Sequence, residues 1–189
     1  MQVQTSELID IRFHGRAGQG VVTASRLLGE AAIAGGKWVH AFPNFGPERM
    51  GAPVSAFTRI SDKTFTVKTQ VYEPDVVCII DPSLVKVNAY YDGIKPHGKI
   101  LVNSATIPDN LKPLAQKYEV WKVDGDEISR KYLGRTIANT VMLGALLKVT
   151  NLVELDHLLE ALRNKFPADI AEKNAQAIRA AFEEVERIE

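Results

Sequence analysis

The segment from His14 to Val22 places three glycines between a predicted strand and a predicted helix. Residues 9–13 alternate apolar and polar side chains, which is the two-residue period of a half-buried strand. After the glycines, apolar residues recur at helical spacing until Gly35 and Gly36 end the helix. Because glycine adopts conformations that other residues avoid, the chain can turn sharply between the two elements. This unit constrains the chain to a fold that layers helices on a sheet.

The same turn is a candidate anion-binding site. The unpaired N–H groups at a helix start, together with the helix dipole, favour an anion there. The spacing is G-x-x-G-x-G, which differs from the G-x-G-x-x-G of dinucleotide-binding folds, and no Lys-Ser/Thr pair follows as in a P-loop. A tight connection without any ligand explains the pattern equally well. The residues that would bind an anion here are Gly15, Arg16, Gly18, Gln19 and Gly20.

Strands and helices alternate along most of the chain, which predicts an α/β fold with a Rossmann-like layered sheet and helices on both faces. Residues 54–60 and 64–67, separated by a polar turn, predict a β-hairpin, so the sheet is expected to be mixed. From residue 137 onward the pattern is wholly helical, with a last helix over residues 168–187. The other predicted strands cover residues 9–13, 76–80, 99–103 and 118–123, and the continuous apolar run at 76–80 is expected at the sheet centre.

Polar residues follow three of these strands at their carboxyl ends. Asp81, Asn103 and Asp124 stand just beyond or at the ends of the strands at 76–80, 99–103 and 118–123. Ligands of open α/β sheets bind outside the carboxyl ends of the strands. Each of the three residues also fits a helix cap or a turn. The sequence favours the cap over the ligand contact.

Composition narrows the class of protein. The 189 residues are expected to form a single domain, residues 1–189. Lys and Arg balance Asp and Glu at 23 each, so no overall field draws the chain to nucleic acid or to an anionic membrane. No signal peptide and no stretch of about 20 apolar residues is present, which predicts a cytoplasmic protein that binds neither membrane nor nucleic acid.

Cys78 is the single cysteine, and it lies in the apolar run of residues 76–80. One thiol excludes an intramolecular disulfide and an iron–sulfur cluster, which needs about four thiolates. We expect Cys78 to be a small core residue. The four histidines are scattered, so no catalytic group and no metal site is predicted.

Three motifs occur in order along the chain. Residues 15–22 read G-R-A-G-Q-G-V-V, residues 45–54 read F-G-P-E-R-M-G-A-P-V, and residues 139–146 read N-T-V-M-L-G-A-L. Together they resemble the gamma subunits of the pyruvate and related 2-oxoacid:ferredoxin oxidoreductases, also called pyruvate synthases. The resemblance spans nearly the whole chain, and Arg16-Ala17 looks more like the pyruvate/2-oxoisovalerate branch than the indolepyruvate branch.

The resemblance implies a complex of anaerobic metabolism that decarboxylates pyruvate or a related 2-oxoacid on thiamine diphosphate. Electrons pass through [4Fe–4S] clusters to ferredoxin, and the products are acyl-CoA and CO2. This chain has one cysteine and lacks the G-D-G…N thiamine diphosphate signature. The chemistry is therefore expected in the alpha, beta and delta subunits. This chain is expected to be an accessory subunit that binds no cofactor alone, is inactive in isolation and can form a homodimer there.

The resemblance also suggests that the chain shapes the approach of CoA, which carries a 3′-phosphate and a pyrophosphate. Backbone N–H groups and fixed guanidinium groups suit both anions. We therefore define an expected anion-binding lip, whose members are Gly15, Arg16, Gly18, Gln19, Gly20 and Arg49. Alternatively, Arg49 pairs with Glu48 or with a partner chain. The aromatics and prolines of residues 42–53 favour an interface with another subunit.

Two other functions remain open at this point. A stand-alone Rossmann-type oxidoreductase would hold NAD or FAD on the glycine turn and needs an acidic residue at the end of its second strand. Residues 37–42, K-W-V-H-A-F, contain no carboxylate, which counts against that alternative. The other open function is that of a purely structural scaffold, in which the glycine turn serves packing alone.

Overall fold

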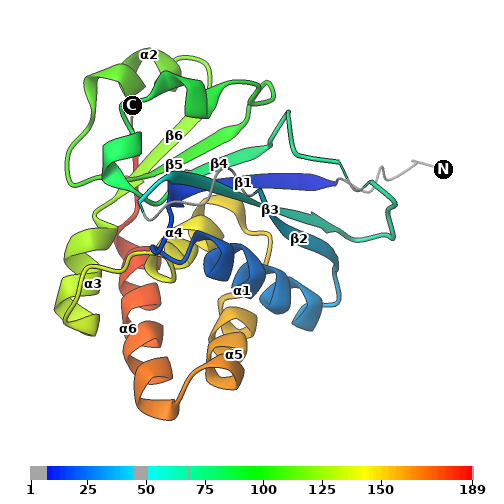
Figure 1. The fold of residues 1–189 in the computed structure, drawn as a ribbon, viewed down its shortest axis with the longest axis vertical. Coiled ribbons are helices and arrows are strands. Elements are labelled where there is room, and N and C mark those ends of the chain that lie inside the picture. The colour runs from blue at the N-terminus through cyan, green and yellow to red at the C-terminus, as the bar shows by residue number, and fades with distance from the viewer. Residues whose placement is uncertain (1–7, 45–50, 68, 189) are drawn as a thin grey trace.

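The computed structural model describes residues 8–44, 51–67 and 69–188 (Figure 1). The strand predicted at residues 9–13 is β1, Ile9–Arg16. Ile11 and Phe13 are fully buried on one face of it, as the alternation predicts. The chain then turns through Gly18 and Gly20 into α1, Val21–Ala34, and Gly35 caps the end of that helix. The strand–glycine–helix unit is confirmed.

One mixed sheet contains the strands of the described residues, in the order β2-β3-β1-β4-β5-β6-β7. β1, β4, β5 and β6 run parallel to one another. β3 is antiparallel to β1 and to β2, and β7 is antiparallel to β6. The strands after β1 are β2 (Trp38–Asn44), β3 (Pro53–Ser61), β4 (Val76–Ile79), β5 (Lys99–Asn103), β6 (Glu119–Val123) and β7 (Glu186–Ile188).

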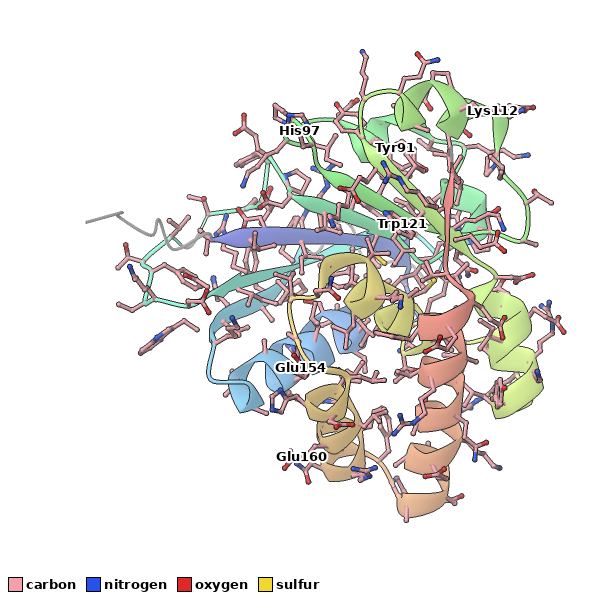
Figure 2. All side chains as sticks on the ribbon, turned by 180° about the vertical axis from the view of Figure 1, so that it is seen from behind. Tyr91, His97, Lys112, Trp121, Glu154 and Glu160 are labelled. Carbon is pink, nitrogen blue, oxygen red and sulfur yellow. The ribbon has the colours of Figure 1, made fainter. Side chains whose placement is uncertain are left out.

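Helices cover both faces of the sheet, as predicted, but unequally (Figure 1). The long helices gather on one face, where α1 and α4 contact strands and α5 and α6 pack on those two helices. Figure 2 shows Glu154 and Glu160 on this helical side and Tyr91 among the short helices on the other side. The long helices are α3 (Gly125–Leu133), α4 (Val141–Thr150), α5 (Leu155–Lys165) and α6 (Ala168–Glu184). The short ones are η1 (Pro82–Leu84), η2 (Asn88–Tyr91), η3 (Asp109–Leu111) and α2 (Lys112–Ala115).

β4 lies at the centre of the sheet and is buried along its whole length. Val76 and Cys78 face the long helices, whereas Val77 and Ile79 face the short ones. A strand with apolar neighbours on both faces needs a continuous apolar sequence, which explains the run at this position. Cys78 is fully buried, and burial raises the pKa of its thiol. Its predicted role as a core residue is confirmed.

The predicted hairpin between residues 54–60 and 64–67 was wrong. β3 pairs instead with β2, with Phe42 opposite Phe57, and residues 64–67 form no strand. The carbonyl oxygens of Val67 and Thr69 accept hydrogen bonds from the guanidinium of Arg59, at 3.2 and 2.6 Å. The buried side chain of Arg59 therefore binds backbone carbonyl groups at the end of the predicted second strand and just after it.

The C-terminal part is not wholly helical, which corrects a second prediction. α6 ends at Glu184, and the chain then adds β7 to the sheet beside β6. Ile188 packs into the core under the short helices, and Glu186 pairs with Lys122 at 2.8 Å. The apolar side chain and the ion pair together favour a strand over a further turn of exposed helix. The buried helix expected from residue 137 begins at Val141.

Candidate functional site

The carboxyl ends of the parallel strands β1, β4, β5 and β6 meet at one edge of the sheet. The glycine turn follows β1 there, and Asp81, Asn103 and Asp124 come from the other three strands. The structure thus brings together the polar groups that the sequence placed at strand ends. This edge is where open α/β sheets bind their ligands.

Asn103, at the end of β5, is fully buried and joins three neighbouring segments. Its amide nitrogen donates to the carbonyl oxygen of Ile80 and to the carboxylate of Asp126, both at 2.8 Å. Its amide oxygen accepts the N–H of Gly125 at 2.9 Å. Asp124 caps α3 by accepting the N–H of Glu127 at 2.9 Å. Both residues therefore organise the strand ends, as the cap interpretation predicts.

Neighbouring side chains pack closely on two glycines of the turn, and one of them, Gly20, also has a φ of +77° that favours glycine. A Cβ atom on Gly15 would lie 2.5 Å from the side chain of Val21, and one on Gly20 would lie 2.3 Å from the side-chain nitrogen of Asn139. Gly18 differs, since nothing lies within 4 Å of the position of its Cβ. Its φ of +93° is a conformation that favours glycine. The turn is therefore closed at Gly15 and Gly20 and open at Gly18.

Gln19 directs its side chain into the protein. Its amide oxygen accepts the backbone N–H of Arg16 at 2.8 Å, and its amide nitrogen donates to the carboxylate of Asp81. Its own backbone N–H donates to the carbonyl oxygen of Arg16 at 3.1 Å. The donors of Gln19 are thus engaged inside the turn.

Arg16 ends β1 with a half-exposed guanidinium group that is held in place from two sides. Nε and one terminal nitrogen donate to the hydroxyl of Ser83 at 3.1 and 2.9 Å, and the other terminal nitrogen donates to the carbonyl oxygen of Gly51 at 3.0 Å. A guanidinium has about five N–H donors, so part of the group stays free of partners among the described residues. Arg16 is a fixed cation with spare donors at the strand-end edge.

The carboxylate of Asp81 lies behind this cation. It is 3.7 Å from Nε of Arg16 and accepts the N–H of Ser83 at 2.7 Å. Burial raises the pKa of Asp81, but the hydrogen bonds from Ser83 and Gln19 and the charge of Arg16 outweigh it, so the pKa lies below its usual value. Asp81 is therefore ionised at neutral pH and orients Arg16 and Gln19. His14, just before the turn, adds no charge, because burial and then the charge of Arg12 lower its pKa to about 3.

Arg49, the remaining member of the predicted anion-binding lip, lies outside the described residues, as does Glu48. Some residues that contact the turn were not among the predicted site residues, and Ser83 and Asn139 are two of them. Ser83 holds the guanidinium of Arg16, and Asn139 donates to the carbonyl oxygen of Gly20 at 3.3 Å. Asn139 opens the third motif, so the motif itself was the available signal, whereas Ser83 is marked only by the cap at Asp81.

Comparison with known proteins identifies the family. The model of the family described as pyruvate ferredoxin/flavodoxin oxidoreductase matches residues 10–184. The chain belongs to this family. The resemblance inferred from the three motifs is confirmed.

Relatives within the family are similar along their whole length. The common subunit gamma of the pyruvate/ketoisovalerate oxidoreductases of Pyrococcus furiosus is 46% identical over 186 residues, covering 96% of this chain and 100% of the relative. The pyruvate synthase subunit PorC of Methanothermobacter thermautotrophicus is 45% identical over 181 residues, covering 96% and 98%. The chain is thus similar to gamma subunits of an oxidoreductase complex.

Solved structures agree with this fold. The pyruvate oxidoreductase subunit PORC of Thermotoga maritima superposes with a TM-score of 0.86 at 37% identity, covering 97% of this chain and 99% of that one. A 2-oxoglutarate:ferredoxin oxidoreductase from Magnetococcus marinus, solved with 2-oxoglutarate, coenzyme A and succinyl-CoA bound, has a TM-score of 0.78 at 21% identity. This chain matches 32% of that longer chain, which shows the shared fold.

The sheet order argues against the alternative of a stand-alone dinucleotide-binding enzyme. In the dinucleotide fold the second strand is the parallel neighbour of the first and ends in an acidic residue. In this family member β3 separates β2 from β1, and β2 ends in Phe42, Pro43 and Asn44. The second strand, Trp38–Asn44, therefore offers no carboxylate of the kind that holds a ribose in that fold.

The donor set does not fit a resident metal cluster. Cys78 is the single cysteine, and it is fully buried in the core. Within residues 8–44, 51–67 and 69–188, no three His, Cys, Asp or Glu side chains gather so that they could hold a metal ion.

The helices in the same ranges are too short or too polar to cross a membrane.

Proposed function

We propose that this chain is the accessory gamma subunit of a thiamine diphosphate-dependent 2-oxoacid:ferredoxin oxidoreductase, and that it contributes to assembly and to the approach of CoA. The complex would convert pyruvate or a related 2-oxoacid and CoA to acyl-CoA, CO2 and reduced ferredoxin. One observation carries the CoA part of the proposal: Arg16 is a fixed cation with spare donors beside the open turn at Gly18. We further propose that residues 1–189 form one domain that works in the cytoplasm.

In this proposal the alpha, beta and delta subunits carry the redox chemistry. Thiamine diphosphate and the [4Fe–4S] clusters would reside there, because the thiol of Cys78 is buried and alone. Ferredoxin would then meet those subunits rather than this chain. The isolated chain is expected to be inactive.

The contacts of the turn divide the anion-binding lip by role. Arg16 and the N–H of Gly18 would face a phosphate of CoA, with Arg49 as the further cation. Gln19 would act as a positioning residue, since its side chain bridges the backbone of Arg16 and the carboxylate of Asp81. Gly15 and Gly20 would allow the close packing that holds the turn in this shape.

The edge of the sheet at β2 supports a role in assembly. β2 is an edge strand of the described sheet, and Trp38 at its start leaves 56% of its surface exposed. Exposed edges and large apolar side chains are features of surfaces that another chain covers. We infer that a partner subunit contacts this edge in the complex. In isolation, a second copy of the chain would take that place.

Arg16→Gln in the assembled complex is expected to raise the KM for CoA about tenfold, the effect of losing about 1.4 kcal/mol of anion binding. The KM for the 2-oxoacid and the thiamine diphosphate content should stay unchanged, because both belong to other subunits. Steady-state kinetics with varied CoA measures this. Arg130→Gln is the matched control for Arg16→Gln, since its exposed guanidinium pairs only locally with Glu127.

Arg49→Ala should likewise weaken CoA use or assembly.

Unaltered CoA kinetics of Arg16→Gln in an intact complex would contradict the CoA role. The scaffold function would then be favoured, because the packing at Gly15 and Gly20 supports a turn that serves structure alone. An equal increase in KM for CoA and for the 2-oxoacid would also contradict it, since that result would indicate a general distortion of the complex.

Assembly is tested by an anaerobic pull-down of the tagged chain from its host, with mass spectrometry and iron analysis. The proposal expects larger subunits that carry iron and thiamine diphosphate. Recovery of an iron-free chain that binds NAD would contradict the proposal and favour the stand-alone oxidoreductase.

A further inference from the structure

A cavity of about 360 Å³ is lined by residues that include neither Arg16 nor a glycine of the turn. We call it the α1–α4 cavity, because Thr23 near the start of α1 and Asn139 and Thr140 at the start of α4 line it. The end of α3 and the first turns of α6 close it on the other side, and these two helices lie side by side in Figure 1. Its volume lies within the range of small-molecule sites, about 300 to 1,000 Å³.

The charge of the cavity is positive. Arg135, just after α3, and Lys173, on α6, both line it, and none of the residues found to line it is acidic. Neither cation forms an ion pair or a side-chain hydrogen bond with the described part of the chain. Other lysines of the long helices do have partners, for example Lys165 with Glu30 at 2.9 Å. Two uncompensated cations from separate segments thus converge on one hollow.

The polar floor of the cavity is buried and already ordered. Asn139, Thr140 and Asn174 are each more than nine-tenths buried. The hydroxyl of Thr140 donates to the amide oxygen of Asn174 at 2.6 Å, and the amide nitrogen of Asn174 donates to the carbonyl oxygen of Ile170 at 2.8 Å. The amide nitrogen of Asn139 donates to the carbonyl oxygen of Gly20 at 3.3 Å. The amide oxygen of Asn139 has no partner within the described residues, so it is an available acceptor for a ligand hydroxyl or amine.

The remaining wall is apolar. Leu133, Ile137 and Phe166 line it and are half-buried. An aromatic ring and two aliphatic side chains suit a flat apolar body better than a hydrated inorganic ion. The cavity therefore combines a cationic rim, an amide oxygen without a partner among the described residues and an apolar wall.

We propose that the α1–α4 cavity binds a small phosphate ester with an aromatic or apolar body, of the size of a nucleoside monophosphate. A phosphate monoester carries a charge of about −1.5 to −2 at neutral pH. Two cations therefore match a phosphate ligand better than they would match a ligand with one carboxylate. Arg135 and Lys173 hold the phosphate, the amide oxygen of Asn139 accepts from a hydroxyl or amine of the body, and Phe166 packs on its face. This site differs from the anion-binding lip, whose cation Arg16 is held by Ser83 and Gly51.

The test is titration of the full-length chain with adenosine 5′-monophosphate as the probe, by calorimetry, with adenosine and inorganic phosphate as separate arms. We expect saturable binding of the nucleotide at one site, weaker binding of phosphate alone and none of adenosine. Because the cations are solvent-accessible, the affinity should fall as salt is raised. The double variant Arg135→Gln/Lys173→Gln should weaken nucleotide binding at least about tenfold. Saturable binding of adenosine as tight as that of the nucleotide would overturn the proposal.

Two controls locate the site. Lys131→Gln removes a cation of α3 that stacks on Tyr132 and does not line the cavity, so nucleotide binding should persist. Arg16→Gln distinguishes this cavity from the anion-binding lip, because Arg16 belongs to the lip and does not line the cavity. If Arg16→Gln abolishes binding while the double variant retains it, the phosphate sits on the glycine turn, which overturns this inference and supports the CoA proposal. Absence of nucleotide binding to the wild-type chain overturns it as well.

Discussion

Gly144→Ala is expected to lower the free energy of unfolding by about 3 kcal/mol, since overpacking against a rigid neighbour is costly. Gly144 lies in the middle of α4 where that helix crosses α6. A Cβ atom there would lie 2.1 Å from the carbonyl oxygen of Ile178 and 2.9 Å from its carbonyl carbon. Both atoms belong to the backbone of α6, so no side-chain rotation relieves the clash. The two helices would have to separate, although alanine itself favours a helix by about 1 kcal/mol.

Urea unfolding followed by far-UV circular dichroism measures this loss. Gly29→Ala is the matched control, because Gly29 is also a buried helical glycine, but its nearest neighbour is a side-chain atom of Val39 at 3.1 Å. We expect that control to stay within about 1 kcal/mol of the wild type. Equal midpoints for the two variants would show that α4 and α6 do not depend on close backbone contact. Gly144 lies in the third sequence motif, so the motif has a packing reason.

Arg59→Met is expected to cost about 3 to 5 kcal/mol, as when one partner of a buried ion pair is removed. The side chain of Arg59 is 3% exposed and forms an ion pair with Asp10 at 2.8 Å. It also donates to the carbonyl oxygens of Val67, Thr69 and Gln70. The variant would leave a buried carboxylate and three carbonyl oxygens without their donor. The segment after β3 should lose its attachment to the sheet.

The loss should depend on pH with a defined sign. Burial raises the pKa of Asp10, although Arg59 lowers it, and the net pKa lies above the usual value. Without Arg59 that pKa rises further. A carboxyl whose pKa is higher in the folded state than in the unfolded state destabilises the fold as pH rises through the folded pKa. The difference between variant and wild type should therefore be smaller at pH 4 than at pH 7.

Chemical denaturation at the two pH values measures that difference. Lys165→Met is the matched control, because its pair with Glu30 is largely exposed and is worth about 1 kcal/mol or less. The double variant Asp10→Asn/Arg59→Met should lose less than the sum of the single losses, since it removes the unpaired charge. A loss in Arg59→Met no larger than in the control would show that the buried pair contributes nothing net.

For the site, sequence reasoning located the members but not their contacts. The glycine turn, Asp81 and Asn103 were placed at strand ends from local patterns, and the structure brings them to one edge of the sheet. Which donors stay free could not be predicted, because Arg16 meets Ser83 and Gln19 meets Asp81 across more than sixty residues of chain. Those contacts assign Gln19 to the interior and leave Arg16 facing outward.

The sequence by itself determined the elements whose signals are local. Alternation at residues 9–13, the glycines after it and the apolar run at 76–80 each act within one strand or one turn, so β1, α1 and β4 were predicted correctly. Tertiary structure alone decided how strands pair. β3 joined β2 rather than residues 64–67, and β7 joined the sheet after a helix, because strand pairing depends on partners distant in the chain. The burial of Arg59 and the close crossing of α4 and α6 at Gly144 likewise depend on residues distant in the chain, which no local pattern predicts.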